Sequence, residues 1–369
     1  MPLSGVKPAQ YRALLLKKVN AAGELMAPFS PPPPEIYPSS PSGFRLRAEF
    51  RMWHEGDELN YVMFRRGEPK TPIAITDFII ADPSIQRLMP ILREHLQNSS
   101  TLRHKLFQVG FLATLSGEML VTLIYHRTLD TEWEDAAEAL LGVLTSHAPP
   151  FSIIGRSRKQ KIVLGKDFVQ ETLPIQDRQF RFRQYEQAFS QPNGNVNIRM
   201  IEWACEQAAM AQGDLLELYC GNGNFTLPLS LHFDNVIATE LSKSSIRAAR
   251  ENLLENGIKN VQLVRLSAEE VTQAMNAERS FRRLADLPQP LDEYRLSTLF
   301  VDPPRAGLDE NTVAMAGQFP TIIYISCNPI TLTENLQTLS NSHRVVSFAL
   351  FDQFPYTDHM ECGVVLQHL

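Results

Sequence analysis

Cys327 is the first residue of this chain whose type and position suggest chemistry. It follows Thr321 to Ile325, an apolar and largely β-branched run with the length and composition of a strand buried on both faces. Ligands of open α/β sheets gather at the carboxyl ends of the parallel strands, so a thiol here would face the ligand as a nucleophile. An isolated cysteine is also a common small core residue. Other polar residues at strand ends must decide between these two roles.

A pair of glycines marks the end of another expected strand. Leu215 to Tyr219 runs directly into a turn that carries Gly221 and Gly223, and glycine permits a tight turn in which the backbone approaches a ligand. The helix that follows would present its positive amino end to the same ligand. Because Thr226 replaces the third glycine of the dinucleotide fingerprint, the turn leaves both NAD and S-adenosylmethionine open as cofactors.

Two acidic residues complete this group of strand ends. Glu240 ends the second expected strand, where a carboxylate can accept both ribose hydroxyls of a nucleoside. The same residue could equally cap the following helix. Asp302 ends the fourth strand and precedes Pro303 and Pro304. This order makes a rigid loop suited to holding a planar base beside a methyl donor, although it is also typical of a simple stiff turn.

Composition indicates an ordinary globular protein that we expect in the cytoplasm. The 369 residues are 44% hydrophobic and 21% charged, a length that favours two compact units. Neither a long apolar run nor a signal-peptide pattern occurs, so we expect no membrane span. The four cysteines form no Cys-x-x-Cys pair, which argues against a metal centre, an iron–sulfur cluster or a disulfide framework.

Charge is unevenly distributed along the chain. Residues 1–190 hold 23 Lys and Arg against 20 Asp and Glu, whereas the remaining residues hold 12 against 21. A polyanion such as RNA should therefore meet the first half first. Basic residues there lie beside aromatic ones, as around Phe107 and at Tyr125 to Arg127. This pattern suits a surface that neutralises phosphates and stacks unpaired bases, although charged strand edges show it too.

The residues up to Ser190 predict a helix and a linker followed by an α+β unit. Residues 8–27 predict a helix with Lys17 and Lys18 on its solvent side, and Pro31 to Pro34 predict a stiff extended linker. The rest of this half predicts strand pairs and helices. They are hairpins at 44–66 and 106–126, helices at 82–97 and 131–147, and short strands around Ile153 and Ile162.

Beyond Ser190 strands alternate with helices, which is the pattern of a parallel doubly wound α/β sheet. The last two strands follow without a clear crossover helix, so we expect an antiparallel ending. The expected domains are therefore 1–43, 44–190 and 191–369. The expected strands are Leu215 to Tyr219, Val236 to Thr239, Val261 to Arg265, Ser297 to Val301, Thr321 to Ile325, Arg344 to Leu350 and Gly363 to Gln367.

Three short motifs resemble those of the RNA (uracil-5-)-methyltransferases. They are Asp-Pro-Pro-Arg-x-Gly-Leu at 302–308, Ser-Cys-Asn-Pro at 326–329 and His-Met-Glu-Cys at 359–362. The likeness covers most of the chain, with further matches at 26–30, 47–51, 103–108, 189–193 and 216–224. Relatives that act on ribosomal RNA commonly carry an iron–sulfur cysteine cluster and a small N-terminal barrel. This chain has neither, so it is more similar to the members that act on tRNA.

The resemblance implies a Rossmann-like class I S-adenosylmethionine-dependent methyltransferase domain preceded by an α+β RNA-binding domain. The implied product is 5-methyluridine (ribothymidine) at the T-loop uridine, U54, in the T-arm of tRNA. By the family match, Cys327 adds to uracil carbon 6, carbon 5 takes the methyl group, and Glu361 removes the carbon 5 proton before elimination. The helix expected after Cys327 would favour its thiolate. His359 is an alternative candidate for the base, because a histidine titrates near neutral pH. It could instead be an ordinary solvated residue of a loop.

The resemblance also implies which residues hold the two substrates. Those expected to contact S-adenosylmethionine are Gln191, Tyr219, Asn224, Glu240 and Asp302. Those expected to contact the RNA are Arg51, Phe107 and His126. Core packing is the competing interpretation for Phe107.

Three alternatives to this function stay open. The same chemistry could act on another structured RNA, such as transfer-messenger RNA or ribosomal RNA. The chain could instead be an RNA-folding chaperone in which methylation is secondary. A nicotinamide-dependent oxidoreductase is disfavoured by the missing third glycine and by the cysteine after the fifth strand.

Overall fold

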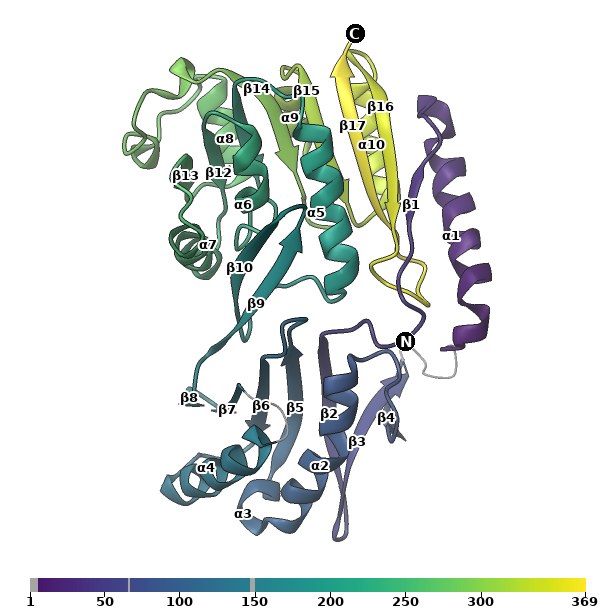
Figure 1. Cartoon of the computed structure of the whole chain (residues 1–369), viewed down its shortest axis with the longest axis vertical. Helices are drawn as coiled ribbons and strands as arrows, with labels where there is room; N and C mark the ends of the chain where they lie inside the picture. Colours follow the sequence, from purple (N-terminus) through teal and green to yellow (C-terminus); the bar gives the residue numbers. More distant parts are fainter. Residues whose placement is uncertain (1–5, 66, 147–149) are drawn as a thin grey trace. The chain divides into compact units, whose positions relative to one another are not determined.

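The computed structural model describes residues 6–65, 67–146 and 150–369. Within these ranges the chain forms two compact units, each visible in Figure 1. The first consists mainly of Ser40–Thr172 and Arg183–Gly194, and the second of Gln10–Ser39, Leu173–Phe182 and Asn195–Leu369. The division differs from the expected boundaries chiefly in residues 10–39, which group with the second unit.

The first unit contains the expected hairpins and helices. Its helices are α2 (Pro83–Asn98), α3 (Ser100–Arg103) and α4 (Thr131–Thr145). Its strands are β2 (Arg47–Glu55), β3 (Glu58–Arg65), β4 (Glu68–Ala74), β5 (Leu106–Ala113), β6 (Met119–Tyr125), β7 (Phe151–Ser157) and β8 (Gln160–Leu164). These strands form one sheet in the order β4-β3-β2-β5-β6-β7-β8, in which only β6 and β7 pair in parallel. Strand β4 was not expected from the sequence.

Strand β2 alternates between a buried and an exposed face. Ala48, Phe50 and Met52 are buried, whereas Glu49 and Arg51 are exposed, as the two-residue period of a strand requires. Helices α2 and α4 lie over the buried face. The Tyr61 hydroxyl, beside Phe50, donates to the Met89 carbonyl of α2 at 3.0 Å, and α4 inserts Trp133 where Gly155 leaves room. The face that carries Glu49 and Arg51 is not the helix-covered one.

The hairpin of β9 (Phe168–Ile175) and β10 (Arg178–Tyr185) forms a separate two-stranded sheet within the described residues. Neither strand was expected, because residues 166–186 are rich in charged and amide side chains and show little apolar periodicity.

The second unit holds the doubly wound sheet. Its helices are α1 (Tyr11–Met26), α5 (Gly194–Ala208), α6 (Thr226–Leu229), α7 (Lys243–Glu255), α8 (Ala268–Met275), α9 (Glu310–Ala316) and α10 (Pro329–Leu339). Its strands are β1 (Glu35–Tyr37), β11 (Asp214–Leu218), β12 (Val236–Thr239), β13 (Val261–Val264), β14 (Leu296–Val301), β15 (Thr321–Ser326), β16 (His343–Phe351) and β17 (Glu361–His368).

The strand order is β1-β16-β17-β15-β14-β11-β12-β13. Strands β11 to β15 pair in parallel, whereas β17 runs antiparallel to both β15 and β16. The expected Rossmann-like sheet with an antiparallel ending is thus confirmed. Figure 1 shows the strands of this sheet beside α1 and α5, with β17 leading to the C-terminus.

Helices cover both faces of this sheet. Buried residues of α1, α8, α9 and α10 join the core cluster that includes Leu216, Leu299 and Tyr324 on one face. On the other face α5 places Trp203 against Phe351, and a side chain at Gly363 would collide with the same indole ring. The sheet is therefore the middle layer of three.

The segment after the prolines forms an unexpected strand at the sheet edge. Glu35–Tyr37 pairs in parallel with β16 from Ala349 to Phe351, and the Asp352 amide donates to the Tyr37 carbonyl at 3.0 Å. The preceding prolines cannot donate to a ladder, so they predicted only a linker. An edge strand tolerates such neighbours because it needs partners on one side only.

Candidate active site

The candidate active site lies where the central strands of the second unit end. Neighbouring parallel strands have their carboxyl ends at one edge of the sheet. The residues that directly follow β11, β12, β14 and β15 are Tyr219, Glu240, Asp302 and Cys327. We call this edge, together with the start of β17, the carboxyl-edge site.

Cys327 lies in the short turn between β15 and α10. Asn328 caps this helix by accepting a hydrogen bond from the Ile330 amide at 3.2 Å, and Pro329 occupies the first turn. Cys327 is half-buried, whereas the other three cysteines are fully buried. Its thiol is therefore the cysteine side chain with access to a ligand.

Glu361 lies across from Cys327 at the end of a strand pair. Ser326 of β15 pairs with Cys362 of β17 in the antiparallel register. Cys327 directly follows Ser326 and Glu361 directly precedes Cys362, and the charge of Glu361 acts on the Cys327 thiol, so the two side chains lie near each other. The Glu361 side chain is buried. The fold thus brings together the two residues that were expected to act as nucleophile and proton acceptor.

Burial and mutual repulsion hold protons on the acidic groups of this site. Burial raises the pKa of Asp302 to about 7. Burial and then Asp302 raise the pKa of Glu361 well above its ordinary range, with Lys18 acting in the opposite direction. Burial, then Glu361 and Asp302, raise the pKa of Cys327 to about 11, opposed by Arg305. The helix start after Cys327 is thus outweighed, and Glu361, once ionised, is a stronger base than a free glutamate.

Arg305 and His359 form a second pair at this edge. Arg305 Nη2 donates to His359 Nδ1 at 3.2 Å, and the Arg305 carbonyl accepts from Asn328 Nδ2 at 3.0 Å. Burial and then Arg305 lower the pKa of His359. His359 is therefore a half-buried, hydrogen-bonded residue rather than a solvated one, and Arg305 ties it to the turn that carries Cys327.

Lys18 is buried, so its expected place on the solvent side of its helix is wrong. Its ammonium donates to Asp352 Oδ1 at 2.5 Å and to the Phe354 carbonyl at 3.2 Å, and the residue is only 9% exposed. Asp352 directly follows β16, and Phe354 lies in the loop that leads to Glu361. Helix α1 therefore anchors the loop that precedes the proposed proton acceptor.

The turn after β11 leaves its backbone open. Tyr219, Gly221 and Gly223 adopt φ values of 61°, 56° and 89°, in the left-handed region that favours glycine. A Cβ at Gly221 would meet no atom within 4 Å, whereas one at Gly223 would lie 2.5 Å from Leu227 Cδ1. Packing therefore requires glycine at 223, while the space over Gly221 is available to a ligand.

Glu240 braces this turn and does not cap a helix. Its carboxylate accepts from the Gly221 amide at 3.1 Å and from the Ser242 amide at 2.7 Å. The cap of α7 is instead Ser242, whose hydroxyl accepts from the Ser245 amide at 3.3 Å. The helix-cap interpretation of Glu240 is therefore wrong, and its carboxylate stands beside the open turn.

The other expected cofactor residues lie in different units. Asn224 and Asn197 exchange two side-chain amide hydrogen bonds of 2.9 Å, which couple the glycine turn to α5. Gln191 belongs to the first unit, in the segment between β10 and α5. Its expected contact with the cofactor therefore stays a prediction.

Glu217 is a buried polar residue that sequence reasoning missed. It lies within β11, burial raises its pKa to about 8 with Asp302 acting in the same direction, and its Oε2 atom has no hydrogen-bond partner among the described residues. A glutamate inside the apolar run Leu215 to Leu218 was the available signal, because such a residue is rarely buried without a ligand or partner.

The residues of the carboxyl-edge site fit a nucleoside cofactor such as S-adenosylmethionine. Glu240 stands beside the open turn, where its carboxylate can accept from ribose hydroxyls, and a cationic sulfonium would favour the ionised form of Asp302. The open backbone at Gly221 provides room for the ligand.

The three expected RNA contacts come together in the first unit. The Arg51 guanidinium lies 3.6 Å from the centre of the Phe107 ring, and His126 stacks on the same ring at 3.9 Å. Arg51 and His126 are exposed and Phe107 is half-buried, so Phe107 is not a core residue. The three side chains form a stacked platform, which we call the Arg51–Phe107–His126 stack.

Neither a membrane span nor a metal centre occurs in the described residues. No helix in the described part of the chain is long and apolar enough to cross a bilayer. Residues 6–65, 67–146 and 150–369 hold no group of three or more His, Cys, Asp or Glu side chains that could bind a metal ion.

Sequence comparison gives strong matches over the full length. Residues 10–369 match the model of the family described as tRNA (Uracil-5-)-methyltransferase. A tRNA/tmRNA (uracil-C(5))-methyltransferase of Aromatoleum aromaticum is 53% identical over 366 residues, which cover 99% of this chain and 98% of the relative. A protein of the same name from Acinetobacter baumannii (strain AYE) is 52% identical over 364 residues, which cover 98% and 99%.

Structure comparison supports the fold. The Pyrococcus abyssi tRNA (uracil-54, C5)-methyltransferase, solved in complex with S-adenosyl-L-homocysteine, superposes with a TM-score of 0.71. The match covers 96% of this chain and 83% of the other, at 19% sequence identity.

Proposed function

Because this chain belongs to the tRNA (uracil-5-)-methyltransferase family, we propose that it transfers a methyl group from S-adenosylmethionine to carbon 5 of the T-loop uridine of tRNA. The product is 5-methyluridine. Since its substrates would be tRNA molecules, the proposal places the enzyme in the cytoplasm. We further propose which residues catalyse the reaction, in which order the steps occur, and that the enzyme recognises the T-arm of the tRNA.

The proximity of Cys327 and Glu361 is the observation that carries the mechanism. Carbon 5 of uracil is too weak a nucleophile to take a methyl group unaided. Addition of the Cys327 sulfur to carbon 6 forms a C–S bond and moves the ring electrons towards carbon 5, which then attacks an electrophilic carbon. S-adenosylmethionine supplies the electrophilic methyl group. Glu361 then accepts the carbon 5 proton, and the electron pair left behind expels the Cys327 sulfur.

The raised pKa values have a place in this sequence of steps. The pKa of Cys327 is raised to about 11 and that of Glu361 is raised well above its ordinary range, so both groups carry a proton in the protein alone. Both protons must pass to water before the sulfur adds to carbon 6. The ionised Glu361 is then a stronger proton acceptor than a free glutamate. His359 sits beside Arg305 with a lowered pKa, so it is poorly suited to keep a proton there.

Four residues of the carboxyl-edge site would hold the methyl donor. Glu240 would bind the ribose hydroxyls from its braced position beside Gly221, while the backbone of the open turn lies against the ligand. Asp302 would lie nearest the target base. The full proposed set is Tyr219, Asn224, Glu240 and Asp302, with Gln191 as the additional contact implied by the family.

The RNA would be gripped by the first unit. The target uridine must leave its loop, at a cost of a few kcal/mol for unstacking. Stacking of a displaced base on an aromatic face offsets roughly 1–3 kcal/mol. The Arg51–Phe107–His126 stack offers such a face with positive charge beside it. This arrangement supports recognition of the T-arm by the first unit.

A second substrate is supported by the names of the similar proteins. Relatives at 53% and 52% identity are named for both tRNA and tmRNA. Transfer-messenger RNA with a T-like loop would meet the same residues and undergo the same chemistry.

Tritium release tests the proposed function. A T-arm hairpin labelled with tritium at uridine carbon 5 should release one tritium into water for each methyl group transferred when S-adenosylmethionine is present. Replacing the T-loop uridine by cytidine should abolish the release. Full activity on the cytidine hairpin, or methyl transfer without tritium release, would contradict it.

A further inference from the structure

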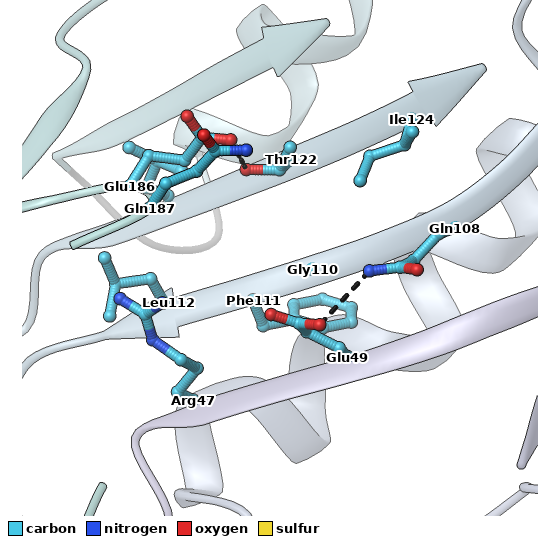
Figure 2. Close-up of a pocket in the computed structure, with 11 residues that line it drawn as sticks. Arg47, Glu49, Gln108, Gly110, Phe111, Leu112, Thr122, Ile124, Glu186 and Gln187 are labelled. Atoms are coloured by element: carbon cyan, nitrogen blue, oxygen red, sulfur yellow. Dashed lines mark hydrogen bonds between the residues drawn. The ribbon is translucent and has the colours of Figure 1, made fainter. Parts of the chain in front are cut away.

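A polar hollow opens on the first unit, on the sheet face that the helices leave bare. Its volume is about 420 Å³. Figure 2 shows Glu49 and Gln108 on one side, Thr122, Glu186 and Gln187 on another, and Arg47 at one end. We call it the Gly110 pocket.

The sheet register explains why the face is hollow here. Gly110 of β5 pairs with Glu49 on β2 and with Thr122 on β6. The side chains of Glu49 and Thr122 therefore flank Gly110, which has no side chain to fill the space between them. A Cβ at Gly110 would lie 3.7 Å from Thr122 Cβ and 3.8 Å from Glu49 Cγ, which is ordinary contact. The hollow therefore exists because Gly110 has no side chain. The surrounding structure would accept a larger residue at this position.

Hydrogen bonds fix the walls of the pocket. Gln108 Nε2 donates to Glu49 Oε2 at 3.2 Å, which leaves the other carboxylate oxygen without a bond to Gln108. Across the hollow the buried Glu186 accepts from Arg156 at 2.6 and 2.5 Å and from the Thr122 hydroxyl at 3.2 Å. Neighbouring donors thus orient both carboxylates, as a preformed binding site requires.

Arg47 supplies the donor at the end of the pocket. Its Nη2 atom donates to the Ala188 carbonyl at 2.9 Å. Its Nε atom is buried and has no hydrogen-bond partner among the described residues. This atom is enclosed by protein, so a ligand would meet the guanidinium of Arg47 where the residue lines the pocket.

Charge decides which part of an RNA the pocket can take. Arg156 neutralises Glu186, so Glu49 is the carboxylate left to accept from a ligand, and an exposed carboxylate suits a neutral donor better than a phosphate. A base edge carries no charge and can donate to a carboxylate. The Arg51–Phe107–His126 stack adjoins the pocket, because Arg51 pairs with Gln108 across β2 and β5. An RNA on the stack would hence bring neighbouring bases over the hollow.

We propose that the Gly110 pocket binds one unpaired guanine of the RNA. Guanine presents two adjacent N–H donors, at N1 and N2, to which one carboxylate can bind in a bidentate way, and beside them the O6 acceptor for Arg47. Adenine, cytosine and uracil each place an acceptor next to their donor, which would face the second oxygen of Glu49. This inference rests on the proposed function, because it presumes that the first unit binds the RNA substrate.

Inosine scanning tests the guanine contact. Inosine lacks only the 2-amino group, so each guanine of a T-arm hairpin is replaced by inosine in turn, and the dissociation constant is measured for wild type and Glu49→Gln. At one position inosine should weaken wild-type binding about tenfold and should leave Glu49→Gln binding unchanged, since one bidentate base contact is worth about that much. Equal effects in both proteins at every position would overturn the proposal.

Two further variants keep the test specific. Glu58→Gln removes an exposed carboxylate at the turn of the same hairpin and should retain the wild-type response to inosine. Gly110→Val fills the hollow and should remove that response even with Glu49 intact. A normal inosine response in Gly110→Val would also contradict the proposal. Methylation of the unmodified hairpin by wild type is measured in parallel, and its absence would overturn the proposed function instead.

Discussion

Cys327 and Glu361 flank the paired residues Ser326 and Cys362, and the charge of Glu361 acts on the Cys327 thiol. The pairing of β15 with β17 therefore brings the turn that carries the thiol close to the carboxyl group. A carboxylate so close to the thiol suits the proposed role of accepting a proton from a ring bonded to the sulfur. This relationship leads directly to the first prediction.

Glu361→Gln should stop the reaction after methyl transfer. The amide cannot accept the carbon 5 proton, so elimination fails and the RNA remains bonded to Cys327. Denaturing gel electrophoresis with methyl-labelled S-adenosylmethionine should show the label on a protein–RNA adduct. Asp358→Asn, which changes an exposed carboxylate in the same loop, should release product like wild type. Rapid release of methylated RNA by Glu361→Gln would remove Glu361 from its role.

Alkylation should report the raised pKa of Cys327. The other cysteines are buried, so iodoacetamide should label Cys327 first in the protein without ligands. Because only the thiolate reacts and the pKa is about 11, the rate should rise about tenfold per pH unit between roughly pH 8 and pH 10. Asp302→Asn removes a nearby negative charge and should raise the rate at pH 9. A rate whose midpoint lies near pH 8.5 and which levels off below pH 10 would show an ordinary thiol.

Lys18→Met should destabilise the second unit strongly. The substitution leaves Asp352 buried without its cation, and breaking a buried ion pair in this way costs about 3–5 kcal/mol. Urea denaturation should show the loss, whereas Lys17→Met, at an exposed position of the same helix, should change stability by less than about 0.5 kcal/mol. Adding Asp352→Asn to Lys18→Met should recover much of the loss. Equal midpoints for wild type and Lys18→Met would contradict the buried pair.

Glu217 should make stability fall as the pH rises. Its pKa is about 8 in the folded protein and 4.5 in the unfolded reference, so the folded state binds the extra proton between these values. The contribution of Glu217 to the free energy of unfolding is therefore complete below about pH 4.5 and is lost as the pH rises through about 8. Without ligands, Glu217→Gln should match wild type near pH 5 and exceed it by roughly 2–4 kcal/mol at pH 8.5. A pH-independent difference would contradict this assignment.

Much of the doubly wound sheet was predictable from the sequence, because its strands are short apolar runs separated by helical periods. The apolar run that ends at Ser326 is by itself enough to place Cys327 at the carboxyl edge of the sheet. Glu361 had no such signal. The segment before it shows no regular period, so its role came only from the family resemblance. Its place near Cys327 depends on the pairing of β15 with β17.

Long-range pairs explain most of what sequence reasoning missed. Lys18 follows a helical pattern that places it beside exposed Lys17, yet its partner Asp352 lies 334 residues away. The Gly110 pocket depends likewise on which residues of β2 and β6 flank β5. Local periodicity contains no information on either pairing, since both arise from the order of strands in the sheets.

A covalent trap tests the central claim most directly. A T-arm hairpin with 5-fluorouridine at the target position should form a stable adduct with the enzyme and S-adenosylmethionine, because fluorine cannot leave as a proton does. Mass spectrometry of the digested adduct should place the RNA on Cys327, and Cys327→Ala should form none. An adduct that persists in Cys327→Ala, or that maps to another residue, would contradict covalent catalysis by this thiol.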